Sequence, residues 1–161
     1  MQACCKWLLP VFLLYGCSGQ EATGPVEVRW DRETCTRCAM AVGDRHSSAQ
    51  VRGAPAGQRT RAYAFDDIGC AVIWLDGQSW KDDVRTEIWV TDHRTGSWLD
   101  ARTATFMPGM RSSMGYDLGA QPEASPEGMD FAHARLYIYD IEASEHVHGG
   151  RHQGPGGAGA P

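Results

Sequence analysis

The sequence predicts an α+β fold built from short antiparallel strands and few helices. Residues 86–91 alternate apolar and polar side chains, which is typical of a half-buried strand. Asp67 precedes an apolar stretch at 68–75, and this order predicts a capped helix that ends at Gly77. No parallel βαβ pattern surrounds these elements, so we expect the strands to pair as antiparallel neighbours.

The remaining elements follow from the same two periodicities. Alternation predicts strands at 26–30, 61–65 and 114–120, and the strongest strand of the second half at 136–141. Gly, Ala and Pro at 52–58 predict a loop between two hairpin strands, and 92–96 reads as a turn. Residues 100–105 have a spacing compatible with a helix.

Composition fits one modest globular domain and argues against nucleic acid as a partner. The chain has 161 residues, of which 42% are hydrophobic and 22% are charged. The net charge is −5, and no basic stripe is visible. Since binding to phosphates needs clustered Lys and Arg, we expect no nucleic-acid interface.

The N-terminus resembles a bacterial lipoprotein signal. Residues 7–15 form an apolar run that is too short to span a bilayer but suits a signal peptide at 1–16. The segment ending at Cys17 resembles a lipobox, so we expect Cys17 to be lipidated and 17–25 to be a tether. The protein would then be anchored to a bacterial membrane by its lipid, facing the periplasm. The Gly- and His-rich residues 143–161 predict a disordered tail after a domain at 26–142.

The number of cysteines in the folded part indicates a functional site. Once the signal peptide and the lipidated Cys17 are set aside, Cys35, Cys38 and Cys70 remain in the folded part. Three thiols cannot all pair as disulfides, even in an oxidising compartment, so at least one is free or bound to something else.

The motif Cys35-x-x-Cys38-x-Met40 favours copper(I). This soft ion prefers thiolate and thioether ligands and accepts a low coordination number. On an extended strand, Cys38 and Met40 would point to the same side and share one ion. Met114, at the start of a predicted strand, is a third candidate ligand, whereas Met107 and Met110 are expected in the core.

Other uses of the motif remain open at this point. Zinc would need a second ligand pair that the folded part does not offer. A thiol–disulfide oxidoreductase using Cys35 and Cys38 would place the motif at a helix N-terminus after a buried strand. Two further alternatives are a structural disulfide between the same residues and a docking lipoprotein whose thiol pair has no function.

The other sulfur and imidazole side chains have simpler expected roles. Cys70 lies in an apolar helix and is expected to be a packing residue. We expect His46 and His93 to be solvated and His133 to be half-buried without binding metal. The tail residues His146, His148 and His152 would at most bind metal weakly.

These motifs together resemble the NosL family, the nitrous oxide reductase accessory lipoproteins. Four stretches that recur in order carry the resemblance: the lipobox at Cys17; Cys35-x-x-Cys38-x-Met40; Phe65-Asp66-Asp67-Ile68-Gly69-Cys70; and Val90-Thr91-Asp92 with Trp98-Leu99-Asp100-Ala101 leading to Met114-Gly115-Tyr116. The family usually has Gly where this chain has Ala39, and its pattern includes neither the short second half nor the His-rich tail.

The resemblance implies a fold of two small ββαβ units, at about 26–91 and 92–142, similar to a domain of organomercurial lyases. It implies a copper chaperone that is not an enzyme, with Cu(I) held by Cys38, Met40 and Met114, and with Cys35 as a further candidate ligand. The partners would be nitrous oxide reductase, whose catalytic copper–sulfide centre receives the copper, or the maturation transporter complex of that enzyme.

Overall fold

The computed structural model describes residues 22–149, and its architecture is α+β, with two antiparallel sheets and two helices among those residues. The larger sheet has the strand order β2-β1-β3-β4, formed by Arg61–Phe65, Ala49–Gly53, Glu87–Thr91 and Trp98–Asp100. With helix α1 (Ile68–Asp76), the elements β1, β2, α1 and β3 follow the expected ββαβ order.

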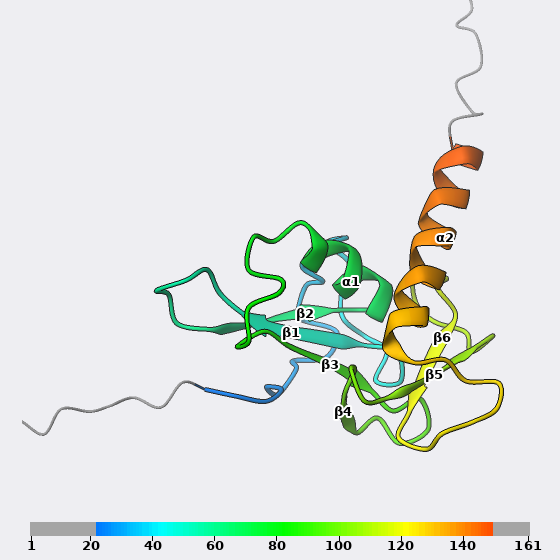
Figure 1. The fold of residues 1–161 in the computed structure, drawn as a ribbon, viewed down its shortest axis with the longest axis horizontal. Coiled ribbons are helices and arrows are strands. Elements are labelled where there is room, and N and C mark those ends of the chain that lie inside the picture. The colour runs from blue at the N-terminus through cyan, green and yellow to red at the C-terminus, as the bar shows by residue number, and fades with distance from the viewer. Residues whose placement is uncertain (1–21, 150–161) are drawn as a thin grey trace, which may run out of the picture.

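Strand β1 lies in the middle of the sheet and is buried along its whole length. Helix α1 packs on β1 and β2, above the sheet in the view of Figure 1, while the N-terminal segment passes below it. The Gln50 side chain in β1 accepts a hydrogen bond from the Val26 N–H at 2.9 Å and donates one to the Val26 carbonyl at 2.8 Å. The strand predicted at 26–30 is therefore wrong, because a side-chain amide replaces a strand partner there.

Helix α1 begins and ends where the sequence predicts. The Asp67 side chain accepts a hydrogen bond from the Gly69 N–H at 2.9 Å, which satisfies one of the free donors of the first turn. Gly77 ends the helix, and its N–H donates to the last-turn carbonyl of Trp74. Because Asp67 lies two residues after the end of β2, this cap fixes the position of the first turn relative to the sheet.

The second half of the chain adds a hairpin and a helix to the same core. Strands β5 (Thr105–Pro108) and β6 (Leu118–Gln121) pair with each other, so 100–105 forms a turn leading into a strand and only the end of 114–120 is a strand. Buried side chains from Val28 to Ile138 form one continuous cluster. The two halves therefore share a core and are not separate units.

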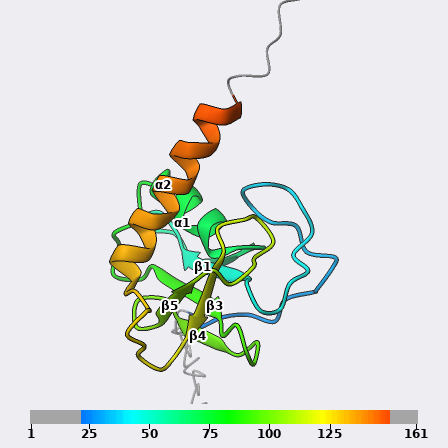
Figure 2. The same cartoon turned by 90° about the vertical axis from the view of Figure 1, so that its right-hand side faces the viewer.

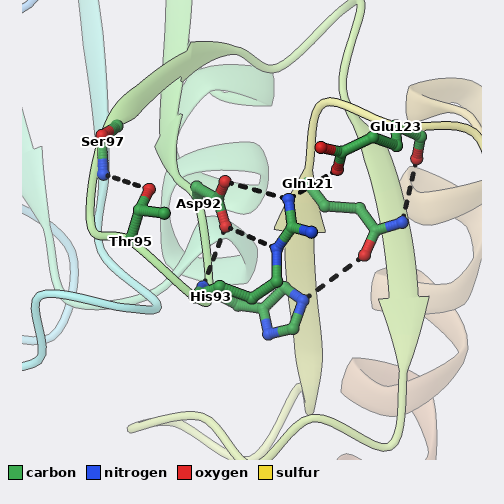
Figure 3. Close-up of polar contacts among 7 residues, drawn as sticks. Asp92, His93, Thr95, Ser97, Gln121 and Glu123 are labelled. Carbon is green, nitrogen blue, oxygen red and sulfur yellow. Dashed lines mark hydrogen bonds and ion pairs between the residues drawn. The ribbon is translucent and has the colours of Figure 1, made fainter.

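A polar cluster joins the two sheets where β3 leads into its turn. The His93 N–H donates to the Ala120 carbonyl of β6 at 2.8 Å. Arg94 forms ion pairs with both Asp92 and Glu123, and the His93 ring contacts the Gln121 side chain (Figure 3). These contacts hold β6 against the end of β3.

Helix α2 (Phe131–Gly149) occupies the place of the strand predicted at 136–141. Ala134 and Ile138 are fully buried one helical turn apart, while Leu136 between them is 61% exposed. Asp130 precedes the helix and accepts a hydrogen bond from the His133 N–H at 2.9 Å. Packing against α1 and β5 therefore overrides the alternating pattern, and the second half ends as ββα (Figures 1 and 2).

Two further expectations concern the ends of the chain. Disorder predicted from residue 143 onward is wrong up to Gly149, because α2 continues to that residue. The structure does not describe residues 1–21 and 150–161. The predicted signal peptide at 1–16, the predicted lipidation site Cys17 and most of the predicted tether therefore lie outside the described residues. Between 22 and 149, no helix is both long enough and apolar enough to cross a membrane.

Candidate metal centre

Three cysteine side chains from two parts of the chain meet at one point. The Sγ atoms of Cys35, Cys38 and Cys70 all lie within 4.8 Å of one another. Cys35 and Cys70 are buried and Cys38 is half-buried, and all three are free thiols. Three converging sulfur atoms could bind a soft metal ion, and the cluster has access to solvent on the Cys38 side.

Cys35 and Cys38 lie on a tight turn and not on a strand. The Cys35 N–H donates to the Met40 carbonyl at 2.7 Å, and the Ala39 N–H donates back to the Cys35 carbonyl at 3.0 Å. Ala39 has a φ of 62°, in the left-handed region. The expected alternation of Cys38 and Met40 along an extended strand is therefore wrong, since the chain reverses between them.

The turn is attached to the start of α1 by the strand that precedes the helix. The Thr36 N–H donates to the Ala64 carbonyl of β2 at 2.9 Å, and Cys70 is the third residue of α1. The expectation that Cys70 is only a packing residue is incomplete. Its thiol is fully buried, as expected, but it also completes the sulfur cluster.

The three thiols have different acidities because they hydrogen bond to one another. A hydrogen bond from the Cys70 thiol, assisted by backbone donors, lowers the pKa of Cys35 to about 5. The same bond, together with burial, raises the pKa of Cys70, and burial raises the pKa of Cys38. At neutral pH the metal-free cluster thus holds one thiolate and two thiols, and a metal bound by all three sulfurs would displace two protons.

Arg37, between the two cysteines of the motif, connects the cluster to α2. Its Nη1 donates to the Tyr116 hydroxyl at 2.6 Å and lies 3.9 Å from the Sγ of Cys70. Its Nη2 lies 2.8 Å from each carboxylate oxygen of Glu142, and the Tyr116 hydroxyl also donates to Glu142. Sequence reasoning missed this residue, because its partners are 33 to 105 positions away.

The loop at 112–117 lies against the first turn of α1. A Cβ placed on Gly69 would be 2.3 Å from the Tyr116 ring, so only glycine permits this close packing. The Met114 N–H donates to Oδ2 of Asp67 at 3.3 Å, and the Met114 side chain is half-buried against the core. The structure thus brings the backbone of this predicted ligand to the helix that carries Cys70.

The other predicted candidates have different surroundings. Met40 is 53% exposed and Met110 is 37% exposed, so Met110 is not the core residue that was expected. Met107 is half-buried in β5.

The histidines of the folded part do not join the sulfur atoms in any metal-binding group of the described residues. His46 is exposed, as expected, and His93 is half-buried beside Gln121. His133 was expected to be half-buried, but its side chain is 71% exposed and pairs with Asp130.

A comparison with protein-family models and with curated proteins gives no match. The geometry of the cysteine cluster therefore carries the functional argument.

Proposed function

We propose that the protein carries copper(I) at the cysteine cluster and passes it to a partner in the bacterial cell envelope. The observation that carries this proposal is the approach of the Cys35, Cys38 and Cys70 sulfur atoms to within 4.8 Å of one another. Copper(I) accepts two or three soft ligands, so the cluster suits it without further groups.

Zinc is a weaker candidate for the same cluster. Structural zinc sites have four ligands, and the described residues offer three cysteines with no histidine or carboxylate in the group. A three-ligand zinc site would keep an open position, as catalytic zinc sites do. The positive charge of Arg37, 3.9 Å from the Sγ of Cys70, disfavours a doubly charged ion there.

Partial exposure of one ligand supports transfer over storage. Cys38 is the half-buried member of the cluster, and exposed Met40 lies two residues further along the same turn. A partner thiolate or thioether could reach the ion from this side and exchange for Cys38 first. Met114, whose N–H is bonded to the cap of α1, would add its thioether to the bound ion.

The resemblance to the NosL family supports a specific recipient. On that basis, the copper would go to the catalytic copper–sulfide centre of nitrous oxide reductase, directly or through its maturation transporter complex. Lipidation at Cys17 would keep the carrier on the membrane, facing the periplasm. Mass spectrometry of the mature protein tests the anchor, which a Cys17→Ser variant should lack.

A thiol–disulfide oxidoreductase is the second candidate, and the low pKa of Cys35 favours it. In such enzymes, however, the acidic cysteine is the exposed one that attacks the substrate. Here Cys35 is 1% exposed, while the accessible Cys38 has a raised pKa. The reactive thiolate is thus shielded from a protein disulfide, which supports metal carriage over exchange.

Anaerobic titration with copper(I) against a coloured chelator separates the two functions. The carrier should bind one equivalent in competition with the chelator, and a Cys38→Ser/Cys70→Ser variant should lose this binding. Absence of copper binding together with reduction of insulin disulfides would instead show the oxidoreductase. A Met129→Leu variant, altered away from the three cysteines in sequence, is the matched control.

A further inference from the structure

Arg37 is the cation closest to the cysteine cluster among the contacts found in the described residues. Its Nη1 lies 3.9 Å from the Sγ of Cys70, and its side chain is 26% exposed. Both ends of the guanidinium are held, one by Tyr116 and the other by Glu142. This positive charge is therefore fixed in place and partly shielded from solvent, so its field acts on whatever the sulfurs bind.

The charge of the loaded cluster depends on the metal. When copper(I) and zinc(II) displace the same thiol protons, the copper complex is one unit more negative than the zinc complex. A fixed positive charge stabilises the more negative complex by more, whatever the geometry of the sulfur ligands. Sulfur ligands alone bind both ions well. The fixed charge therefore changes the relative affinity of the cluster for a singly charged and a doubly charged ion.

We propose that Arg37 is a specificity-determining residue, which biases the cysteine cluster toward a singly charged metal ion through its fixed charge beside Cys70. This inference rests on the proposed function, because it concerns the same site. It goes further in assigning metal selectivity to a residue that is not a ligand.

Glu142 acts in the opposite sense. Its carboxylate takes both Nη2 contacts at 2.8 Å, so it lies beyond the guanidinium and partly cancels its charge. Neutralising Arg37 and neutralising Glu142 should therefore move the selectivity in opposite directions. A purely structural role for the Arg37–Glu142 ion pair would instead make both substitutions disturb the cluster in the same way.

The test measures dissociation constants of copper(I) and zinc(II) by anaerobic chelator competition, using the folded protein with the signal peptide removed. Arg37→Gln should reduce the preference for copper(I) over zinc(II) by at least about tenfold. Glu142→Gln should increase that preference, and Arg37→Lys, which keeps the charge, should retain most of it. Arg135→Gln breaks another arginine ion pair, with Asp76, and should leave the preference unchanged.

The outcomes of this test separate a charge effect of Arg37 from a purely structural role of the Arg37–Glu142 ion pair. An unchanged preference in Arg37→Gln, or shifts of the same sign in Arg37→Gln and Glu142→Gln, would overturn the role of Arg37. If Arg37→Gln fails to fold, Glu142→Gln still decides the test. A reduced preference for copper(I) in Glu142→Gln would by itself contradict the inference. Failure of the wild-type protein to bind copper(I) would refute the carrier function itself and not the charge effect.

Discussion

The N–H of Met114 donates a hydrogen bond of 3.3 Å to the carboxylate of Asp67, the residue that caps the helix carrying Cys70. The same carboxylate accepts from the Gly69 N–H at 2.9 Å. One buried side chain thus holds together the first turn of α1 and a loop that lies 47 residues away in the sequence. The position of that loop beside the cysteine cluster therefore depends on Asp67.

The burial of Asp67 makes the stability of the fold depend on pH. Burial raises its pKa from an ordinary 3.8 to about 6. Because the folded-state pKa is the higher one, the stabilisation from the protonated side chain is complete below about pH 4 and is lost as the pH rises through 6. In urea unfolding, the free energy of unfolding of the wild type should fall by about 3 kcal/mol more than that of Asp67→Asn between about pH 3 and about pH 7. Parallel pH profiles for the two proteins would contradict this.

The turn that carries Cys38 is strained at Ala39, and glycine should relieve the strain. A left-handed φ of 62° costs an alanine about 1 kcal/mol, whereas glycine adopts it freely. Since the Ala39 side chain is exposed, Ala39→Gly should raise the free energy of unfolding by up to about 1 kcal/mol in chemical denaturation. Ala143→Gly, at an exposed position of α2, should lower it by a similar amount. Destabilisation by Ala39→Gly would show that the turn is not strained.

The metal-free protein should carry one thiolate well below neutral pH. The hydrogen bond from Cys70 keeps the pKa of Cys35 at about 5, so thiolate absorbance in the ultraviolet should fall only as the pH drops through that value. Cys35→Ser should abolish the step. Cys70→Ala, which removes the donor, should move it upward toward the ordinary cysteine value. A first thiolate transition near that ordinary value in the wild type would contradict the cluster geometry.

The two predicted methionine ligands can be separated by substitution with leucine, which keeps the volume and removes the sulfur. Met114→Leu should weaken copper(I) binding by about tenfold or more, comparable to the loss of a group that supports a metal shell. Met40→Leu should chiefly slow transfer to an acceptor, because Met40 is exposed on the open side. Chelator competition and stopped-flow transfer measure these two quantities. Equal affinities for Met114→Leu and the Met129→Leu control would remove Met114 from the ligand set.

Local signals were sufficient for helix α1 and for two strands of the larger sheet. Asp67, the apolar stretch after it and Gly77 predicted α1 because capping and helical periodicity are both properties of nearby residues. The strands at 61–65 and 86–91 and the hairpin loop between β1 and β2 were confirmed for the same reason. The cysteine motif contains two of the three residues whose sulfur atoms the structure brings together.

The errors arose where distant contacts decide the structure. Residues 136–141 alternate like a strand, but Ala134 and Ile138 are buried against other elements only when the segment is helical. Spacing cannot show that Cys70, on a helix, faces a turn 32 residues earlier, nor that Arg37 reaches Glu142. Met40 was misplaced because the left-handed Ala39 reverses the chain, and a non-glycine residue gives no signal of such a turn.

The most direct test of the central claim is X-ray absorption at the copper edge of the copper(I)-loaded protein. Three cysteine sulfurs in contact with one ion predict a shell of sulfur alone, which should lose one scatterer in Cys70→Ser while the protein stays folded. A shell dominated by nitrogen or oxygen, or a spectrum unchanged by Cys70→Ser, would contradict the assignment of the metal to this cluster.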